Sequence, residues 1–257
     1  MAPHTFPGVI VALSVVTGEI GESDCEALGD GALAQPVNSW TSIAYIGMGL
    51  AIAVSAVIRR GRVADVRAYL GESLVYAACL AAVGLGSVLF HGPQPDGSRT
   101  LHDLPILITI VFIVVHDVYL VFPNLRQRWV AFVGAAIAAI VLTLLSADAG
   151  IAATGIGIAA TVALEYVIFR KRLRPIPARR QVQAYAAIVG VAAVAGASWL
   201  LGRSDSPLCD PQDVFQFHGV WHTISSLIFG LWWWLAIDRS STAPADRDRV
   251  VTPPDSD

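Results

Sequence analysis

Charged side chains are scarce in this sequence. Asp, Glu, Lys and Arg make up 14% of its 257 residues, whereas 55% of the residues are hydrophobic. Soluble domains carry about 25% charged residues. Proteins that bind nucleic acid have a strongly basic balance, but the formal net charge here is −3. The scarcity of charge therefore argues against a nucleic-acid-binding protein and predicts an all-α, multi-pass membrane protein.

Lysine and cysteine are also rare. Lys171 is the only lysine, and the other sixteen basic residues are arginine. With the abundant alanine, this composition suggests a GC-rich bacterial genome. The three cysteines are Cys25, Cys79 and Cys209, and no two of them form a C-x-x-C pair. A zinc site made of thiolates and a dithiol redox motif are therefore not indicated.

Long apolar stretches dominate the rest of the chain. A helix needs about 20 apolar residues to cross a bilayer, and seven stretches meet this length: 39–58, 71–91, 102–122, 129–146, 149–169, 183–201 and 215–237. A further apolar run at 6–16 is too short to span and is expected at the interface or packed outside. The chain is thus divided into an N-terminal segment at 1–38, a seven-span domain at 39–237 and a disordered polar tail at 238–257.

The arginines between the spans predict the orientation. Alternate loops and the C-terminal tail hold 15 of the 17 basic residues, and the opposite loops hold only Arg99 and Arg203. Basic residues stay on the cytoplasmic side. The N-terminus is therefore expected outside and the C-terminus in the cytoplasm. Three further features lie at the predicted inner ends. The WWW run at 232–234 is expected in an interfacial belt of aromatic residues. Glu165 is expected to extend toward the headgroups, and His116 is expected to form a polar pair with Asp117.

Histidines and acids converge at the predicted outer face. Span 2 ends there with His91, span 3 begins there with Asp103, and span 7 begins there with His218 and His222. Residues four apart share one helical face, so His218 and His222 can bind one ion together. By the same spacing, Ser87 lies one turn below His91. Three histidines with an open position are the ligands of a catalytic zinc site.

The sequence between the paired histidines lacks an acid. In H-E-x-x-H proteases the intervening glutamate is the general base, but here the intervening residues are GVW. A base must come from elsewhere, and Asp103 is the candidate, with Ser87 donating a hydrogen bond to the developing oxyanion. Two alternatives are helix–helix hydrogen bonds made by the histidines and haem ligation from two spans.

Three short motifs resemble the alkaline ceramidase family, which belongs to a larger group of seven-span hydrolases that includes the adiponectin receptors. They are GSVLFH at 86–91, LHDLP at 101–105 and HGVWH at 218–222, with weaker matches in NSWTSIAY at 38–45 and DCE at 24–26. The resemblance implies a zinc-dependent amidase of sphingolipid metabolism that cleaves ceramide to a sphingoid base and a fatty acid. It implies His91, His218 and His222 as zinc ligands, with Ser87 and Asp103 as catalytic side chains.

The resemblance also bears on calcium and on the cysteines. Eukaryotic members carry a calcium site on an Asp-Trp-Cys-Glu-x-Asn motif and a later Glu, whereas this chain has SDCEALGD and Gln35. Calcium is therefore doubtful, although Asp24, Glu26 and Asp30 could bind a cation loosely. The family implies a disulfide between an N-terminal cysteine and an outer loop, here Cys25 and Cys209.

Several functional questions stay open at this level. The amide chemistry can act on ceramide or on another N-acyl lipid, since many bacteria lack ceramide. A receptor or sensor of the adiponectin-receptor type with a non-catalytic or weakly catalytic zinc is the alternative function, and a haem-binding electron carrier is a third. The expected location is a bacterial inner membrane with the site toward its outer face. The sequence does not indicate the head group, the acyl length or the oligomeric state.

Overall fold

The computed structural model describes residues 21–238. The apolar run predicted at 6–16 and the tail beyond residue 238 lie outside this range. Within it the helices are α1 (Pro36–Arg59), α2 (Val66–His91), α3 (Ser98–Val121), α4 (Arg128–Leu145), α5 (Ala147–Lys171), α6 (Ala178–Leu201) and α7 (Phe217–Trp233). A 3-10 turn (Arg60–Arg62) follows α1, and a π-helical turn (Trp234–Asp238) extends α7.

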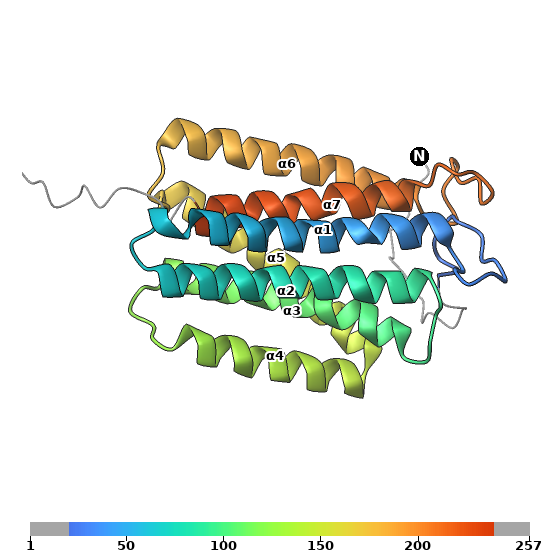
Figure 1. Cartoon of the computed structure of the whole chain (residues 1–257), viewed down its shortest axis with the longest axis horizontal. Helices are drawn as coiled ribbons and strands as arrows, with labels where there is room; N and C mark the ends of the chain where they lie inside the picture. Colours follow the sequence, from blue (N-terminus) through green and yellow to red (C-terminus); the bar gives the residue numbers. More distant parts are fainter. Residues whose placement is uncertain (1–20, 239–257) are drawn as a thin grey trace, which may run out of the picture.

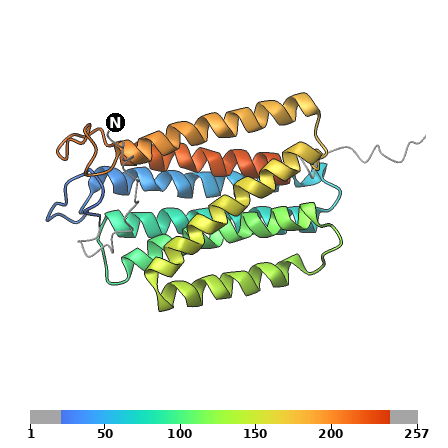
Figure 2. The ribbon, with the colours of Figure 1, turned by 180° about the vertical axis from the view of Figure 1, so that it is seen from behind.

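The seven helices lie side by side in one bundle (Figure 1). Helix α1 packs between α2 and α7, α3 packs on α2, and α6 packs on α7. Helix α5 crosses the back of the bundle obliquely (Figure 2) and contacts α3 and α4. All seven helices are long and apolar enough to cross a membrane. The predicted all-α, seven-span fold is therefore confirmed, and the chain is a multi-pass membrane protein.

Local sequence signals explain where several helices begin. Pro36 occupies the first turn of α1, a position at which the missing N–H of proline costs no helical hydrogen bond. The side chains of Asp65 and Ser146 accept hydrogen bonds from backbone N–H groups in the first turns of α2 and α5. Such caps satisfy donors that have no intrahelical partner.

A close approach between α2 and α3 depends on Gly86 and Pro105. Pro105 has no N–H to donate to the carbonyl of Leu101, four residues earlier. That carbonyl oxygen lies where the Cβ of any larger residue at position 86 would be. A glycine at this position therefore lets the end of α2, with Ser87 and His91, lie against the start of α3.

The hydrophobic core lies at the far end of the bundle, away from His91. It consists of buried aromatic and aliphatic side chains from α1, α2, α3 and the end of α7. Trp232 and Trp233 belong to it and are only 4% and 5% exposed. The Nε1 of Trp233 donates to Ser73 Oγ at 3.0 Å. The prediction of an interfacial tryptophan belt is therefore wrong for these two residues, which pack between helices.

Charged side chains also lie inside the far end. Glu165 does not extend outward as predicted, because its carboxylate accepts hydrogen bonds from Arg174, Trp232 and Tyr185. Arg174 lies in the α5–α6 loop and is only 2% exposed. The guanidinium of Arg174 also pairs with Asp117 at 3.4 Å. The C-terminal end of α5 is thus held by buried ion pairs.

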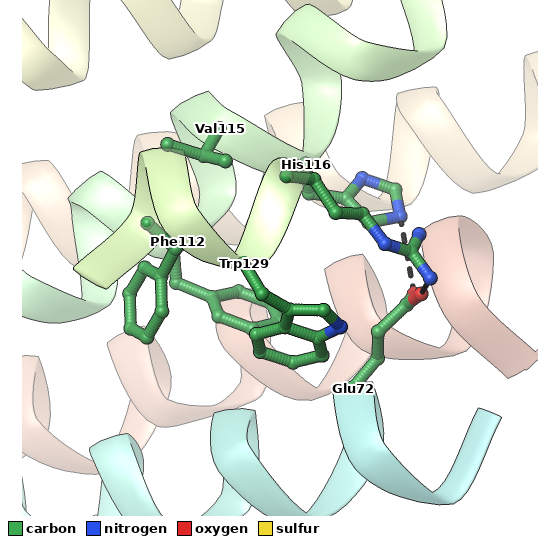
Figure 3. Close-up of a pocket in the computed structure, with 7 residues that line it drawn as sticks. Glu72, Phe112, Val115, His116 and Trp129 are labelled. Atoms are coloured by element: carbon green, nitrogen blue, oxygen red, sulfur yellow. Dashed lines mark ion pairs between the residues drawn. The ribbon is translucent and has the colours of Figure 1, made fainter. Parts of the chain in front are cut away.

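A second ionic contact borders a small apolar pocket at this far end (Figure 3). His116 Nε2 lies 3.8 Å from Glu72 Oε2, and Arg128 pairs with the same carboxylate. His116 Nδ1 lies 3.2 Å from Asp117 Oδ1, as the polar-pair prediction requires. The apolar part of the lining comes from Phe112, Val115, Trp129 and Phe132. The pocket lies at the opposite end of α2 from His91.

Candidate metal centre

Three buried histidines meet where α2 ends and α7 begins. His91 is the last residue of α2, and His218 and His222 lie in the first two turns of α7. Each offers a ring nitrogen, and the three nitrogens lie within 4.8 Å of one another. The exposed fractions of the residues are 0%, 7% and 2%. The end of α2 and the two histidines four residues apart in α7 therefore meet, as the topology predicts.

Gln35 determines which nitrogen of His91 carries a proton. The Nε2 of Gln35 donates to the carbonyl oxygens of Gly21 and Glu26 at 3.0 and 2.8 Å. These oxygens can only accept, so the amide orientation is determined. The Oε1 of Gln35 then faces His91 Nδ1 at 2.6 Å. Because Oε1 also only accepts, Nδ1 of His91 holds the proton and Nε2 keeps a free lone pair.

Two hydroxyl groups of α1 act on His222 in the same way. The Nδ1 of His222 lies 3.2 Å from Thr41 Oγ1 and 3.3 Å from Ser42 Oγ. Both hydroxyls donate to backbone carbonyls of α1, to Val37 at 2.8 Å and to Asn38 at 2.6 Å respectively. They are therefore left as acceptors for the Nδ1 proton of His222, and the Nε2 lone pair of this ring is free as well.

The third ring, His218, lies beside Asp24. The Nδ1 of His218 is 3.3 Å from Asp24 Oδ1, and the other oxygen of Asp24 is 3.9 Å from His91 Nδ1. Burial raises the pKa of Asp24 to about 6, and the nearby charge of Arg203 acts in the opposite direction. The carboxyl group of Asp24 therefore lies against two of the three histidines.

The donor set fits a zinc ion. Within residues 21–238, His91 Nε2 is buried and makes no hydrogen bond, and His218 Nδ1 has the 3.3 Å contact with Asp24 but no hydrogen bond. Unpaired buried nitrogen is costly, and native proteins rarely leave it so. Metal-ligating histidines usually donate their second nitrogen to a neighbouring acceptor, as His91 and His222 do here. Three imidazoles without a thiolate are the ligands of catalytic zinc sites rather than structural ones.

Ser87 lies between this cluster and α1. Its hydroxyl is 3.5 Å from His222 Nε2 and 2.8 Å from the hydroxyl of Ser42. Since Ser42 already donates to the Asn38 carbonyl, Ser87 is the donor in the serine pair. For Ser87 to donate to a substrate oxygen instead, its O–H must turn away from Ser42. Ser87 thus lies next to the histidine cluster, and in this structure its hydroxyl donates to Ser42 of α1.

Asp103 lies at the rim of the site rather than against the histidine cluster. Its carboxylate contacts His102 Nδ1 at 2.7 Å, and a quarter of its side chain is exposed. The ring of His102 in turn lies 6.0 Å from the ring of His91. Asp103 is thus at the level of the three histidines but one side chain away from them. Its role as a general base stays a prediction.

The Ceramidase family profile matches residues 31–250. The chain belongs to the ceramidase family. This match spans all seven helices and includes the three histidines, Ser87 and Asp103. No curated protein sequence matches the chain significantly. The family membership thus agrees with the resemblance in the sequence motifs and supports a ceramidase-type hydrolase.

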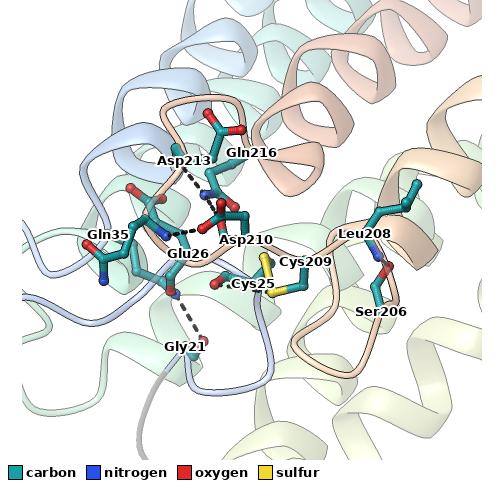
Figure 4. The surroundings of a disulfide bond; sticks show 11 residues. Gly21, Cys25, Glu26, Gln35, Ser206, Leu208, Cys209, Asp210, Asp213 and Gln216 are labelled. Atoms are coloured by element: carbon teal, nitrogen blue, oxygen red, sulfur yellow. Dashed lines mark hydrogen bonds between the residues drawn. A yellow bond between two sulfur atoms is a disulfide. The ribbon is translucent and has the colours of Figure 1, made fainter.

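An N-terminal segment outside the helices lies against the histidine cluster of this ceramidase-family chain. Cys25 and Cys209 form a disulfide with Cα atoms 5.4 Å apart, and it ties this segment to the α6–α7 loop (Figure 4). Next to it, Cys25 N donates to the Gly202 carbonyl at 2.8 Å. The disulfide partners are those that the family resemblance implied. The free thiol among the described residues is Cys79.

The residues compared with the family calcium motif make other contacts here. Both carboxylate oxygens of Glu26 accept hydrogen bonds from the first turn of α1, from Val37 N at 2.7 Å and Asn38 N at 2.8 Å. Gln35 is engaged with His91, and Asp24 faces the histidines. Glu26 therefore serves as the cap of α1. Its oxygens would have to leave the helix end in order to bind calcium.

We expect that adding millimolar calcium leaves the thermal unfolding of the purified protein unchanged. A ligand that binds only the folded state would stabilise it in proportion to its occupancy. Removing the cap with Glu26→Ala is expected to lower the unfolding free energy by about 0.5–2 kcal/mol, as for other helix caps. The measurement is an unfolding curve with and without calcium. Stabilisation by calcium that is lost in Glu26→Ala would contradict this assignment.

Sequence reasoning missed Gln35, Thr41 and Ser42 as neighbours of the metal centre. A signal was available, because polar residues gather in the first two turns of α1, a helix that is otherwise apolar. These side chains are inside the bundle, with Gln35 and Ser42 both 0% exposed. Asp24 was considered only as a loose cation ligand. Its place beside His218 depends on the disulfide and the loop contacts, which no local pattern reveals.

Proposed function

We propose that this protein is a zinc-dependent intramembrane amidase that hydrolyses ceramide or a related N-acyl lipid to a fatty acid and an amine. The observation that carries the proposal is the orientation of the histidines. Gln35 and the α1 hydroxyls hold the Nδ1 protons of His91 and His222, so that two Nε2 lone pairs remain for a metal. Membership of the ceramidase family supports the reaction class.

The residues divide the work of amide hydrolysis. A zinc ion held by the three histidines supplies Lewis-acid polarisation of a carbonyl and activation of water. Asp103 takes a proton from the attacking water and returns it to the leaving amine nitrogen. Ser87 donates a hydrogen bond to the oxygen that becomes negative as the carbonyl is attacked. Water supplies the hydroxyl of the fatty acid and the hydrogen of the amine, so the reaction needs no other reactant.

An apolar groove in the membrane-spanning region supports a lipid substrate. It lies between α3, α4 and α5, and every residue that lines it is apolar. On α3 the groove begins at Leu107, one turn below Asp103. We infer that this groove receives an acyl chain of the substrate.

The loop charges support an orientation for the site. Arg99 and Arg203 lie at the end of the bundle that holds the histidines, whereas the remaining 15 basic residues lie at or near the opposite helix ends or in the tail. By the positive-inside tendency, the metal centre faces the outer side of the membrane. In a bacterium this would be the periplasmic side of the inner membrane, where the disulfide would persist.

The first test of the proposal is the zinc content of detergent-purified protein, measured by elemental mass spectrometry. We expect about one zinc per chain in the wild type, since three histidines and an open position form one catalytic site. His91→Ala and His222→Ala are each expected to lose it. His116→Ala removes a histidine at the far end of the bundle and is expected to retain it. A zinc-free wild type, prepared without chelator, would refute the metal centre.

The same preparations separate the amidase from the alternative of a receptor. Wild-type protein with zinc is expected to release fatty acid from a fluorescent N-acyl sphingosine or N-acyl amine, whereas His91→Ala is expected to show none. Zinc without turnover on any amide of a chain-length series would favour a sensor in which the metal is structural. A coloured preparation with a haem absorption band would support the electron-carrier hypothesis instead.

A further inference from the structure

Asp24 is a buried carboxylate whose position none of the proposed catalytic steps explains. It is 7% exposed, and burying an ionised carboxylate is costly unless positive charge or hydrogen-bond donors compensate. Within residues 21–238, the ion pairs of Asp24 are with His218 Nδ1 and His91 Nδ1. Neither imidazole carries a formal charge when it presents a lone pair to a metal. Arg203 supplies positive charge nearby, and a divalent ion on the other side of these rings would add to it.

We propose that Asp24 is a positioning residue of the metal centre, whose carboxylate accepts the Nδ1 proton of His218 and so holds Nε2 of that ring toward the metal. This inference rests on the proposed zinc site. Gln35 performs the equivalent task for His91, and Thr41 with Ser42 for His222. Each of the three histidines would then have its own acceptor, and only His218 would have a charged one. Carboxylates behind metal-ligating histidines raise the basicity of the ligand.

The geometry distinguishes this role from that of a fourth metal ligand. Both contacts of Asp24 are made to Nδ1 atoms. In His91 that nitrogen already faces Gln35 Oε1, on the opposite side of the ring from the free Nε2. With His218 oriented as proposed, a carboxylate on the Nδ1 side of both rings would lie behind the ligands, with the rings between it and the metal. The fourth position is thereby left for water and substrate.

The backbone around Asp24 is held by the α6–α7 connection. Asp24 forms an antiparallel bridge with Arg203, and Ser204 N donates to the Ser23 carbonyl at 3.1 Å. The disulfide to Cys209 follows at the next residue, Cys25. The same connection reaches the metal centre directly, because a side chain at Gly202 would collide with the backbone of His218. The disulfide therefore tethers the acceptor to the chain segment that carries its histidine.

The test is the zinc affinity of the full-length protein in detergent, measured by competition with a chromophoric chelator. Asp24→Ala is expected to bind zinc about 10–100-fold more weakly, as typical for loss of such a supporting group. Asp24→Asn keeps the size and an acceptor oxygen but loses the charge, and is expected to fall between Asp24→Ala and the wild type. Asp30→Asn removes a charge from an exposed residue of the same segment and is expected to leave the affinity unchanged.

A spectroscopic readout detects a change in the ligand rather than in overall stability. With cobalt in place of zinc, the visible absorption bands of Asp24→Ala are expected to shift, because His218 is no longer held in one orientation. If Asp24→Ala fails to fold, Asp24→Asn decides. Wild-type zinc affinity together with an unchanged cobalt spectrum in either folded variant would overturn the inference. Absence of zinc binding by the wild type would instead refute the proposed function itself.

The tether gives a second, independent test. Cys209→Ser is expected to weaken zinc binding in the wild-type background, because it releases the segment that holds Asp24. In the Asp24→Ala background the same substitution is expected to have little further effect, since the two changes act through one contact. If Cys209→Ser weakened zinc binding by the same factor in both backgrounds, the disulfide would not act through Asp24. This result would contradict the proposed tether.

Discussion

Replacing Arg174 by alanine is expected to destabilise the protein by about 3–5 kcal/mol, as found when one partner of a buried ion pair is removed. The guanidinium of Arg174 makes a two-point contact with Glu165, at 2.6 and 2.9 Å, and also contacts Asp117 and Tyr185. Burial alone would lower the pKa of Arg174. The negative charge of Glu165 outweighs this effect and raises the pKa, so the side chain stays charged. Without it, two carboxylates would face each other inside the bundle.

A matched control comes from the same basic segment. Arg179 is exposed in the first turn of α6, and Arg179→Ala removes the same charge without removing a buried contact. Its unfolding free energy is expected to stay within about 0.5 kcal/mol of the wild type, as for other surface substitutions. The measurement is chemical unfolding in detergent followed by tryptophan fluorescence. Equal stability of the two variants would contradict a structural role for the buried ion pairs.

Arg174 shows where sequence reasoning reached its limit at the far end of the bundle. It is one of six basic residues in the segment at 170–180, and all six count equally toward orientation. Periodicity does not reveal which of them is buried, because that depends on Glu165 of α5 and Tyr185 of α6 facing one another. The same limitation applies to Trp232, whose indole finds its acceptor in Glu165. Pairings between distant helices have no local pattern.

The histidine cluster was easier to predict, for a physical reason. Histidine is rare in apolar helices because its burial is costly, so its position carries information. The alternation of outward and inward spans gave the levels of His91, His218 and His222, and the spacing of four residues gave their common face. What the helical pattern lacked was the covering segment. Asp24 and Gln35 lie outside the helices, and their contacts with the histidines depend on loop and disulfide geometry.

The largest loss of activity among residues that do not hold the metal is expected for Asp103→Asn. A positioned general base contributes about 100- to 10,000-fold to a reaction, so kcat on a lipid amide should fall within that range. Zinc content is expected to stay at the wild-type level, because Asp103 contacts His102 rather than the three histidines. Asp96→Asn removes a carboxylate from an exposed position shortly before α3, and it is expected to leave kcat unchanged.

The contact between Asp103 and His102 suggests that His102, rather than Asp103, could transfer the proton. The same activity assay distinguishes the two assignments. If Asp103 only orients His102, the imidazole would transfer the proton, and its ring already lies 6.0 Å from that of His91. His102→Ala would then lose as much activity as Asp103→Asn. If Asp103 acts directly, His102→Ala is expected to retain most of kcat, because the carboxylate remains. Full activity in Asp103→Asn would refute the carboxylate as the base and leave the proton transfer to another group at the rim of the metal centre.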